Sequence, residues 1–249
     1  MGLINKDVFV CLDCETTGLE IEKDRIIEIA IVRFDFDNIL ESYETLIDPQ
    51  LPIQEISIAI HHIDDSMVKG KPKIQEILPK AFEFIGKSII VGHGITNDIN
   101  FLCAAAKQNQ VPCKLASHPY LDTLRMARLY GESPINSLEK LRQHFNIAEE
   151  GAHRAMNDVI VNIEVFKYLS RSYKTTEQLI NRLKSPIQLK SMPLGKHKGR
   201  LFSEIPIEYL RWAVNQNFDQ DLLFSLKMEL KKRGKGVHFG QAANPFANL

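Results

Sequence analysis

The sequence lacks long apolar runs and is poor in cysteine. No stretch approaches ~18 consecutive apolar residues, and the N-terminus has no basic region followed by an apolar segment, so we expect neither a membrane span nor a signal peptide. The expected location is cytoplasmic, with no membrane partner. Among the four cysteines, only Cys11 and Cys14 have Cys-x-x-Cys spacing, and no second pair completes a zinc site. We interpret all four as reduced structural thiols.

The sequence also lacks net charge, but its two ends differ in sign. Residues 1–170 contain 17 Lys and Arg against 25 Asp and Glu, whereas residues 171–249 contain 14 against 6. An acidic part could hold metal cations beside a basic part that meets phosphates, although plain surface variation would give the same counts. The chain of 249 residues has room for one large domain, or for one domain with a small appendage.

Two carboxylates close the first predicted strand. An apolar run over residues 8–12 precedes Asp13-Cys14-Glu15 and then the turn Thr16-Thr17-Gly18, a pattern typical of a buried strand. Side chains two residues apart on a strand share a face, so Asp13 and Glu15 point at one place, where a cation would relieve their repulsion. The alternative is that both residues merely end the strand and hydrogen-bond to the turn.

The rest of the pattern predicts strands first and helices later, which favours a mixed α/β fold. Strands over 25–34 and 39–47 would form an antiparallel meander with the first strand, and a fourth strand is predicted over 88–91. Apolar residues at helical spacing predict the helices. These cover residues 53–60, 74–85, 98–107, 122–130 and 137–145, the last capped by Ser137, and a long helix that opens within 151–158 and runs through Leu169.

The chain is expected to divide into four parts. Residues 1–173 would form the main domain, and the basic, Ser/Thr-rich stretch with Ser185-Pro186 makes 174–189 a linker. A small basic accessory module follows over 190–233. Residues 234–249 show little periodicity, and we expect them to be a flexible tail.

Two further aspartates and a histidine are candidate site residues. Asp98 and Asp158 lie in the first turns of predicted helices, and with the strand carboxylates they supply the hard oxygen ligands that two-metal phosphodiester cleavage needs. His153, five residues before Asp158, could take a proton from an attacking water near pH 7. Each also has a simpler interpretation, because carboxylates are good helix starters and many histidines are exposed loop residues.

Three segments resemble the motifs of DEDDh-type 3′→5′ exonucleases. They are Asp13–Gly18, His93–Asp98 and His153–Asp158, and the resemblance covers about residues 5–170. It implies a ribonuclease-H-like α/β fold, with a mixed five-stranded sheet flanked by helices. The sequence departs from the family at Gly94, Asn97 and His62, where Asn, Phe and Gly are common. These departures remove no metal ligand, but they put the shape of the nucleotide pocket in question.

The same resemblance implies a role for each site residue. The general base would be His153, and two Mg²⁺ or Mn²⁺ ions would be held by Asp13, Glu15, Asp98 and Asp158. The backbone at Thr16, Thr17 and Gly18 would hold the 3′-terminal nucleotide. His61 and Ile63 would also bind substrate, with Ile63 lying against the terminal bases.

The C-terminal part is similar to a small module appended to exonuclease X. The likeness spans residues 192–199 and 209–212, where a basic loop between glycines precedes Tyr209 and Trp212. Such a loop with nearby aromatics suits phosphate contact and base stacking. Alternatively, it is a solvated loop and Trp212 is a core residue. Residues 241–246 are similar to a sliding-clamp-binding peptide.

The predicted function is metal-dependent 3′→5′ removal of nucleoside 5′-monophosphates from nucleic-acid 3′ ends, with single-stranded DNA favoured and a role in proofreading or repair. The alternatives are RNA 3′-end trimming, or a catalytically inactive nucleic-acid-binding subunit. A polymerase, a sliding clamp and a second copy of the chain are candidate partners.

Overall fold

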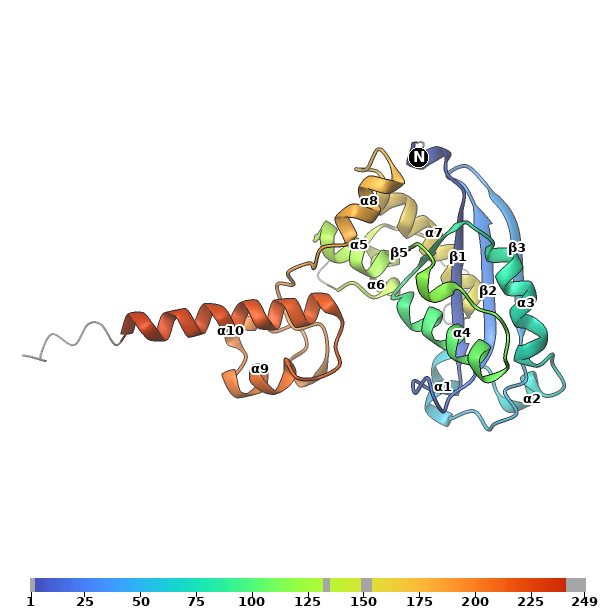
Figure 1. Cartoon of the computed structure of the whole chain (residues 1–249), viewed down its shortest axis with the longest axis horizontal. Helices are drawn as coiled ribbons and strands as arrows, with labels where there is room; N and C mark the ends of the chain where they lie inside the picture. The colour runs from blue at the N-terminus through green and yellow to red at the C-terminus, as the bar shows by residue number, and fades with distance from the viewer. Residues whose placement is uncertain (1–2, 132–134, 149–153, 241–249) are drawn as a thin grey trace, which may run out of the picture. The chain divides into compact units, whose positions relative to one another are not determined.

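The structure, a computed structural model, describes residues 3–131, 135–148 and 154–240, with the backbone alone from 235 to 240 (Figure 1). The chain forms two compact units, Met1–Leu183 and Lys184–Leu249. No described helix is long and apolar enough to cross a membrane. All four cysteines are free thiols, as expected, and Cys11 is buried.

The first unit is built on a mixed five-stranded sheet. Its strands are β1 (Phe9–Thr16), β2 (Ile26–Phe34), β3 (Ile39–Leu46), β4 (Ile89–Gly92) and β5 (Tyr120–Asp122). They lie in the order β3-β2-β1-β4-β5, with β1 to β3 antiparallel and with β4 and β5 parallel to β1 (Figure 1). The predicted fold class and meander are confirmed, and β1 is the central strand.

Helices cover both faces of this sheet. On one face α3 (Ile74–Ile85) and α4 (Thr96–Gln108) bury Val10 and Leu12 of β1 in an apolar core. On the other face lies α7 (Ala155–Ser170), whose Phe166 ring is 4.9 Å from the ring of Phe9. The Cys11 thiol also points to this side and donates to the Val159 carbonyl at 3.7 Å. Odd-numbered residues of β1 therefore face α7, as the two-residue period of a strand requires.

The shorter helices of the first unit connect these layers. They are α1 (Glu55–His61), α2 (Asp65–Val68), α5 (Thr123–Tyr130) and α6 (Leu138–His144). Asp122 caps α5 by accepting a hydrogen bond from the Leu124 amide at 2.9 Å. Ser137 occupies the N-cap position of α6 as predicted, but its side chain makes no capping hydrogen bond.

The expected linker over 174–189 is corrected in its first part. Residues Thr176–Leu183 form helix α8, which belongs to the first unit, so the boundary lies after Leu183 rather than after 173. The Thr176 hydroxyl donates to Asp7 at 2.5 Å, and the Ile4 amide donates to the Lys174 carbonyl at 3.0 Å. Polar composition hid this helix, because Leu179 and Leu183 alone supply its buried stripe.

The second unit has its own small core. It contains the short turns η3 (Gly195–His197) and η4 (Phe202–Glu204), then α9 (Ile207–Ala213) and α10 (Gln220–Gly240). The core residues are Met192, Phe202, Ile205, Leu210, Ala213, Leu222 and Leu226. The expected tail is also corrected, because residues 234–240 continue α10. The Leu-, Lys- and Glu-rich stretch before them favours a helix strongly enough to extend through Gly234 and Gly236.

Candidate active site

Three carboxylates predicted from the sequence meet on the α7 side of the sheet. Asp13 and Glu15 project from β1, and Asp158 lies in the first turn of α7. One ligand atom from each of the three lies within 4.8 Å of the others, and all three side chains are partly buried. A strand places two carboxylates on one face, and the helix that packs on that face adds the third.

Asp98 lies beside this group rather than within it. It stands in the first turn of α4, which follows β4, the parallel neighbour of β1. Its Oδ1 accepts a hydrogen bond from the Cys14 amide at 3.1 Å, and the residue is 9% exposed. The β1 backbone therefore fixes this carboxylate next to the cluster.

The acidic groups disturb one another's ionisation. Burial raises the pKa of Asp13 well above its ordinary value, and Asp98, Glu15 and Asp158 raise it further. Burial, with Asp158 and Glu28, raises the pKa of Glu15 to about 8. Burial raises the pKa of Asp98 to about 7, although backbone amides oppose it. Without a cation the folded chain holds protons here at neutral pH.

We expect the metal-free protein to lose stability as pH rises. Between about pH 4 and about pH 8 the unfolded chain has released the Glu15 and Asp98 protons that the folded chain retains, so the free energy of unfolding falls with pH and levels off above the folded pKa values. Melting temperatures measured in EDTA across this window should fall, and Mg²⁺ or Mn²⁺ should restore them at the alkaline end. Glu15→Gln should reduce the dependence of the melting temperature on pH. An unchanged dependence would contradict the raised pKa of Glu15.

An ion pair between the buried Glu28 and the partly exposed Arg154, which the sequence did not reveal, holds the start of α7. Glu28 is fully buried on β2, directly opposite Glu15 in the strand register. It accepts two hydrogen bonds from Arg154 Nε at 3.1 Å, a third from Nη2 at 2.5 Å, and a fourth from the Ala155 amide at 3.1 Å. The only signal in the sequence is a charged residue inside an apolar strand. The pair fixes the helix end next to Asp158.

We expect Arg154→Lys to impair both stability and cleavage. Lysine keeps the charge but cannot form the two-pronged contact with Glu28, so the free energy of unfolding should fall by about 1–3 kcal/mol. The start of α7 would then be less firmly placed. Chemical denaturation and the cleavage rate report the two effects. Arg142→Lys, which loosens a similar pair with the more exposed Glu139 on α6, is the matched control. Equal effects of Arg154→Lys and Arg142→Lys would contradict a special role of the Arg154–Glu28 pair in placing α7.

The loop after β1 is locked by Asp24. Thr17 is buried, and its hydroxyl donates to Asp24 Oδ1 at 2.9 Å, while Ser57 of α1 donates to the Thr17 carbonyl at 3.0 Å. A Cβ on Gly18 would come within 2.5 Å of the Asp24 carboxylate, so any other residue there would displace Asp24 from this hydrogen bond. Thr16 Oγ1 donates to the Gly18 carbonyl at 2.7 Å. The Thr17 side chain therefore shapes the loop. That the loop backbone contacts the terminal nucleotide stays a prediction.

The predicted contacts of His61 and Ile63 with substrate are corrected. Ile63 is fully buried with Ile27 and Ile53, so it cannot lie against a base. His61 is 2% exposed, and its Nδ1 accepts from the Ile63 amide at 3.0 Å. Ile56 and Ile60, four residues apart on α1, are 71% and 56% exposed.

His153 lies outside the described residues, so its role as general base stays a prediction. Its neighbour Arg154 is placed by the contacts with Glu28.

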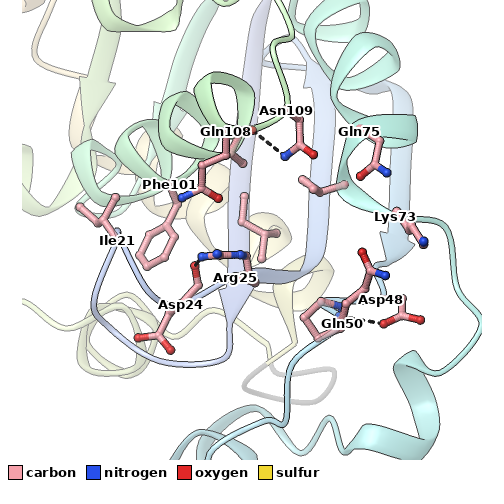
Figure 2. A pocket seen from close by; sticks show the side chains of 14 residues that line it. Ile21, Asp24, Arg25, Asp48, Gln50, Lys73, Gln75, Phe101, Gln108 and Asn109 are labelled. Atoms are coloured by element: carbon pink, nitrogen blue, oxygen red, sulfur yellow. Dashed lines mark hydrogen bonds between the residues drawn. The ribbon is translucent and has the colours of Figure 1, made fainter.

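A separate cavity of about 220 Å³ lies on the α3/α4 side of the sheet. Figure 2 shows it lined by Asp24 and Arg25 of the β1–β2 loop, Phe101 of α4 and Lys73 at the start of α3. None of the clustered carboxylates lines it. The cavity is therefore not part of the acidic site.

Comparison with protein families gives two matches along the chain. A family model described as "Exonuclease" matches residues 10–166, more than half of the chain. A second, described as "Putative quorum-sensing-regulated virulence factor", matches residues 180–234, which nearly coincide with the described part of the second unit.

Individual relatives agree with the first match. The chain is 35% identical over 159 residues to the DNA polymerase III subunit epsilon of Aquifex aeolicus. This alignment covers 64% of this chain and 78% of that protein. It is 33% identical over 196 residues to the PolC-type DNA polymerase III of Clostridium perfringens, covering 76% of this chain but 13% of that much longer protein.

A solved structure shares the fold. Exonuclease X, in complex with 5′ overhanging duplex DNA, superposes with a TM-score of 0.56 at 23% identity, covering 70% of this chain and 99% of that one. This likeness confirms the ribonuclease-H-like architecture of the first unit. By the family match and the identity to the epsilon subunit, the chain belongs to the DEDDh-type family of 3′→5′ exonucleases.

Proposed function

We propose that the protein degrades DNA from single-stranded 3′ ends and releases nucleoside 5′-monophosphates. The observation that carries this proposal is the meeting of Asp13, Glu15 and Asp158 on the α7 side of an exonuclease fold, with Asp98 fixed beside them. A phosphodiester carries negative charge, so an acidic site can act on it only with cations between substrate and carboxylates.

The four carboxylates fit divalent cations. They offer hard oxygen donors, which Mg²⁺ and Mn²⁺ prefer. Burial raises the pKa values of Asp13, Glu15 and Asp98, and neighbouring carboxylates raise those of Asp13 and Glu15 further, so bound cations would stabilise the ionised groups. We propose that these four carboxylates would hold two such ions. When bound, these ions supply positive charge at the scissile phosphate and at the leaving 3′ oxygen.

The chain's own groups complete the reaction. His153 would accept the proton of the attacking water, and the Arg154–Glu28 pair would hold the segment that carries it. The backbone from Thr16 to Gly18 would position the terminal nucleotide, because Asp24 and Ser57 hold that loop in place.

The choice of DNA rests on the relatives. The aligned proteins from Aquifex and Clostridium are named as DNA polymerase III components, and exonuclease X was solved with DNA. A role in proofreading or repair follows from the same likeness. A polymerase, a clamp and a second copy stay predicted partners, and the clamp-like residues 241–246 lie outside the described part of the chain.

Matched oligonucleotides test this proposal. With Mg²⁺ or Mn²⁺, a 5′-labelled single-stranded DNA should give a ladder that shortens from its 3′ end, together with free nucleoside 5′-monophosphates. A duplex with paired ends and an RNA of the same sequence should be cut more slowly. Blocking the 3′ hydroxyl end and adding EDTA are the controls. Faster digestion of RNA would favour 3′-end trimming of RNA, and no digestion of either strand would favour the inactive binding subunit.

A further inference from the structure

We propose that the second unit carries its own binding site for single-stranded nucleic acid, built from the basic loop at residues 195–200 and the aromatic face of α9. This site is independent of the acidic cluster and of cleavage. It concerns the surface of the second unit alone.

The aromatic part of this site is exposed. The sequence had left open whether Trp212 is a core residue or a surface residue. Trp212 is 53% exposed, so it does not belong to the small core of the unit. Its ring centroid lies 5.2 Å from that of Tyr209, one helical turn earlier on α9. A large exposed aromatic offers a face on which any base can stack, and a second ring beside it extends that face.

The basic loop is held against these rings. His197 is buried, and its ring lies edge-on to Tyr209 with the ring centroids 4.5 Å apart. Gly195 has a positive φ of 71°, and a Cβ there would lie 3.1 Å from the Tyr209 hydroxyl, so glycine lets the loop approach. The Met192 amide donates to the Arg200 carbonyl at 2.9 Å and closes the loop. The loop is therefore a preformed element.

Cations on this loop are available for phosphates. Lys196, Lys198 and Arg200 are exposed, and Lys196 Nζ lies 5.1 Å from the centre of the Tyr209 ring. Within the described residues none of the three side chains forms an ion pair, and the only hydrogen-bond partner of the Arg200 guanidinium is His197 Nδ1, at 3.4 Å. The second unit as a whole carries eleven Lys and Arg against five Asp and Glu over residues 184–249. Unpaired cations beside stacking rings match the alternation of phosphates and bases in a single strand.

The chain offers a direct reporter, because Trp212 is its only tryptophan. Titrating the full-length protein in EDTA with a dT oligonucleotide should quench its intrinsic fluorescence, since a stacked base quenches an indole. A matched duplex should quench less, because its bases are already paired. Free N-acetyltryptophanamide corrects for absorption by the oligonucleotide. Binding seen by fluorescence polarisation without quenching would overturn the proposal.

Variants separate stacking from charge. Trp212→Ala should weaken binding of the dT oligonucleotide about five-fold or more, and Trp212→Phe should retain most of the affinity. Replacing Lys196, Lys198 and Arg200 together by alanine should reduce the slope of log Kd against log salt by about two. The matched control replaces the exposed Lys227, Lys231 and Lys232 of α10. Equal effects of the two triple changes would show non-specific charge attraction and overturn the site.

A final pair of outcomes keeps this site distinct from the exonuclease. EDTA prevents metal-dependent cleavage, so quenching of Trp212 by the oligonucleotide does not require an active enzyme. The fluorescence of Asp13→Asn should therefore be quenched as much as that of the unaltered protein. If the protein digests DNA but Trp212→Ala binds the oligonucleotide unchanged, the exonuclease assignment stands and this surface is a site for another class of partner. If the oligonucleotide binds and quenches Trp212 but the protein never digests DNA, the second-unit site stands and the exonuclease activity is ruled out.

Discussion

Asp13→Asn is expected to reduce cleavage by about 10³-fold or more while making the metal-free protein more stable. Asparagine keeps the shape of the side chain but cannot ionise, so folding no longer has to protonate a carboxylate whose charge burial and Asp98, Glu15 and Asp158 disfavour. Loss of a proposed metal ligand should cost several kcal/mol of transition-state stabilisation. Because this protonation is no longer required, the melting temperature in EDTA should rise by a few degrees.

The opposite signs of these two effects make this test specific. A variant that lost activity through misfolding would melt earlier, whereas this one should melt later in EDTA and gain less from added Mn²⁺. The cleavage rate of a labelled strand and the melting temperatures with and without metal are measured for the variant and for the unaltered protein. Asp37→Asn, an exposed acid in the turn between β2 and β3, is the control and should change none of them. A melting temperature that falls in EDTA would argue against a strained acidic cluster.

His153→Ala is expected to lower the turnover rate by about 10²–10⁴-fold, the usual contribution of a general base. Metal binding should survive, because four carboxylates rather than the imidazole are assigned to the ions. The metal-induced rise in melting temperature should therefore match that of the unaltered protein. Affinity for an oligonucleotide in EDTA should be unchanged as well.

The pH dependence gives the sharper readout for His153. A neutral imidazole is needed as the base, so the rate of the unaltered enzyme should fall as pH drops below the pKa of that group, and the variant should lose this limb. Added imidazole should recover part of the activity. An active alanine variant with an unchanged pH profile would remove His153 from the mechanism and leave proton transfer to solvent.

Much of the fold followed from local pattern. The apolar run before Asp13 and the β-branched run of β2 predict buried strands, and the helical spacing from Ile74 to Ile85 predicts a helix, so these elements were predicted close to their observed bounds. The three-residue β5 is too short to show a period. Helix α8 was not predicted because Leu179 and Leu183 are its only buried apolar residues and most of its other residues are polar.

The structure brings Asp13, Glu15 and Asp158 together, as the sequence predicted, but it buries Ile63, which the resemblance had placed against the substrate. A strand period and a helix start fix where Asp13, Glu15 and Asp158 point, so their positions could be inferred from spacing. The direction of Ile63 depends on the left-handed turn at His62, where φ is 59°, which turns the following residues into the core. No spacing rule reports such a turn at a histidine.

By itself the sequence determined the mixed fold, the acidic strand end and the order of the three motifs, because these depend on residues close together in the chain. Only the tertiary structure decided how distant segments act on one another. It brought Arg154 to the buried Glu28, 126 residues away in the chain, to form an ion pair that holds α7. It also turned Trp212 outward, because Leu210 and Ala213 already fill the small core beneath α9. Burial is a property of packed neighbours, and no single segment carries it.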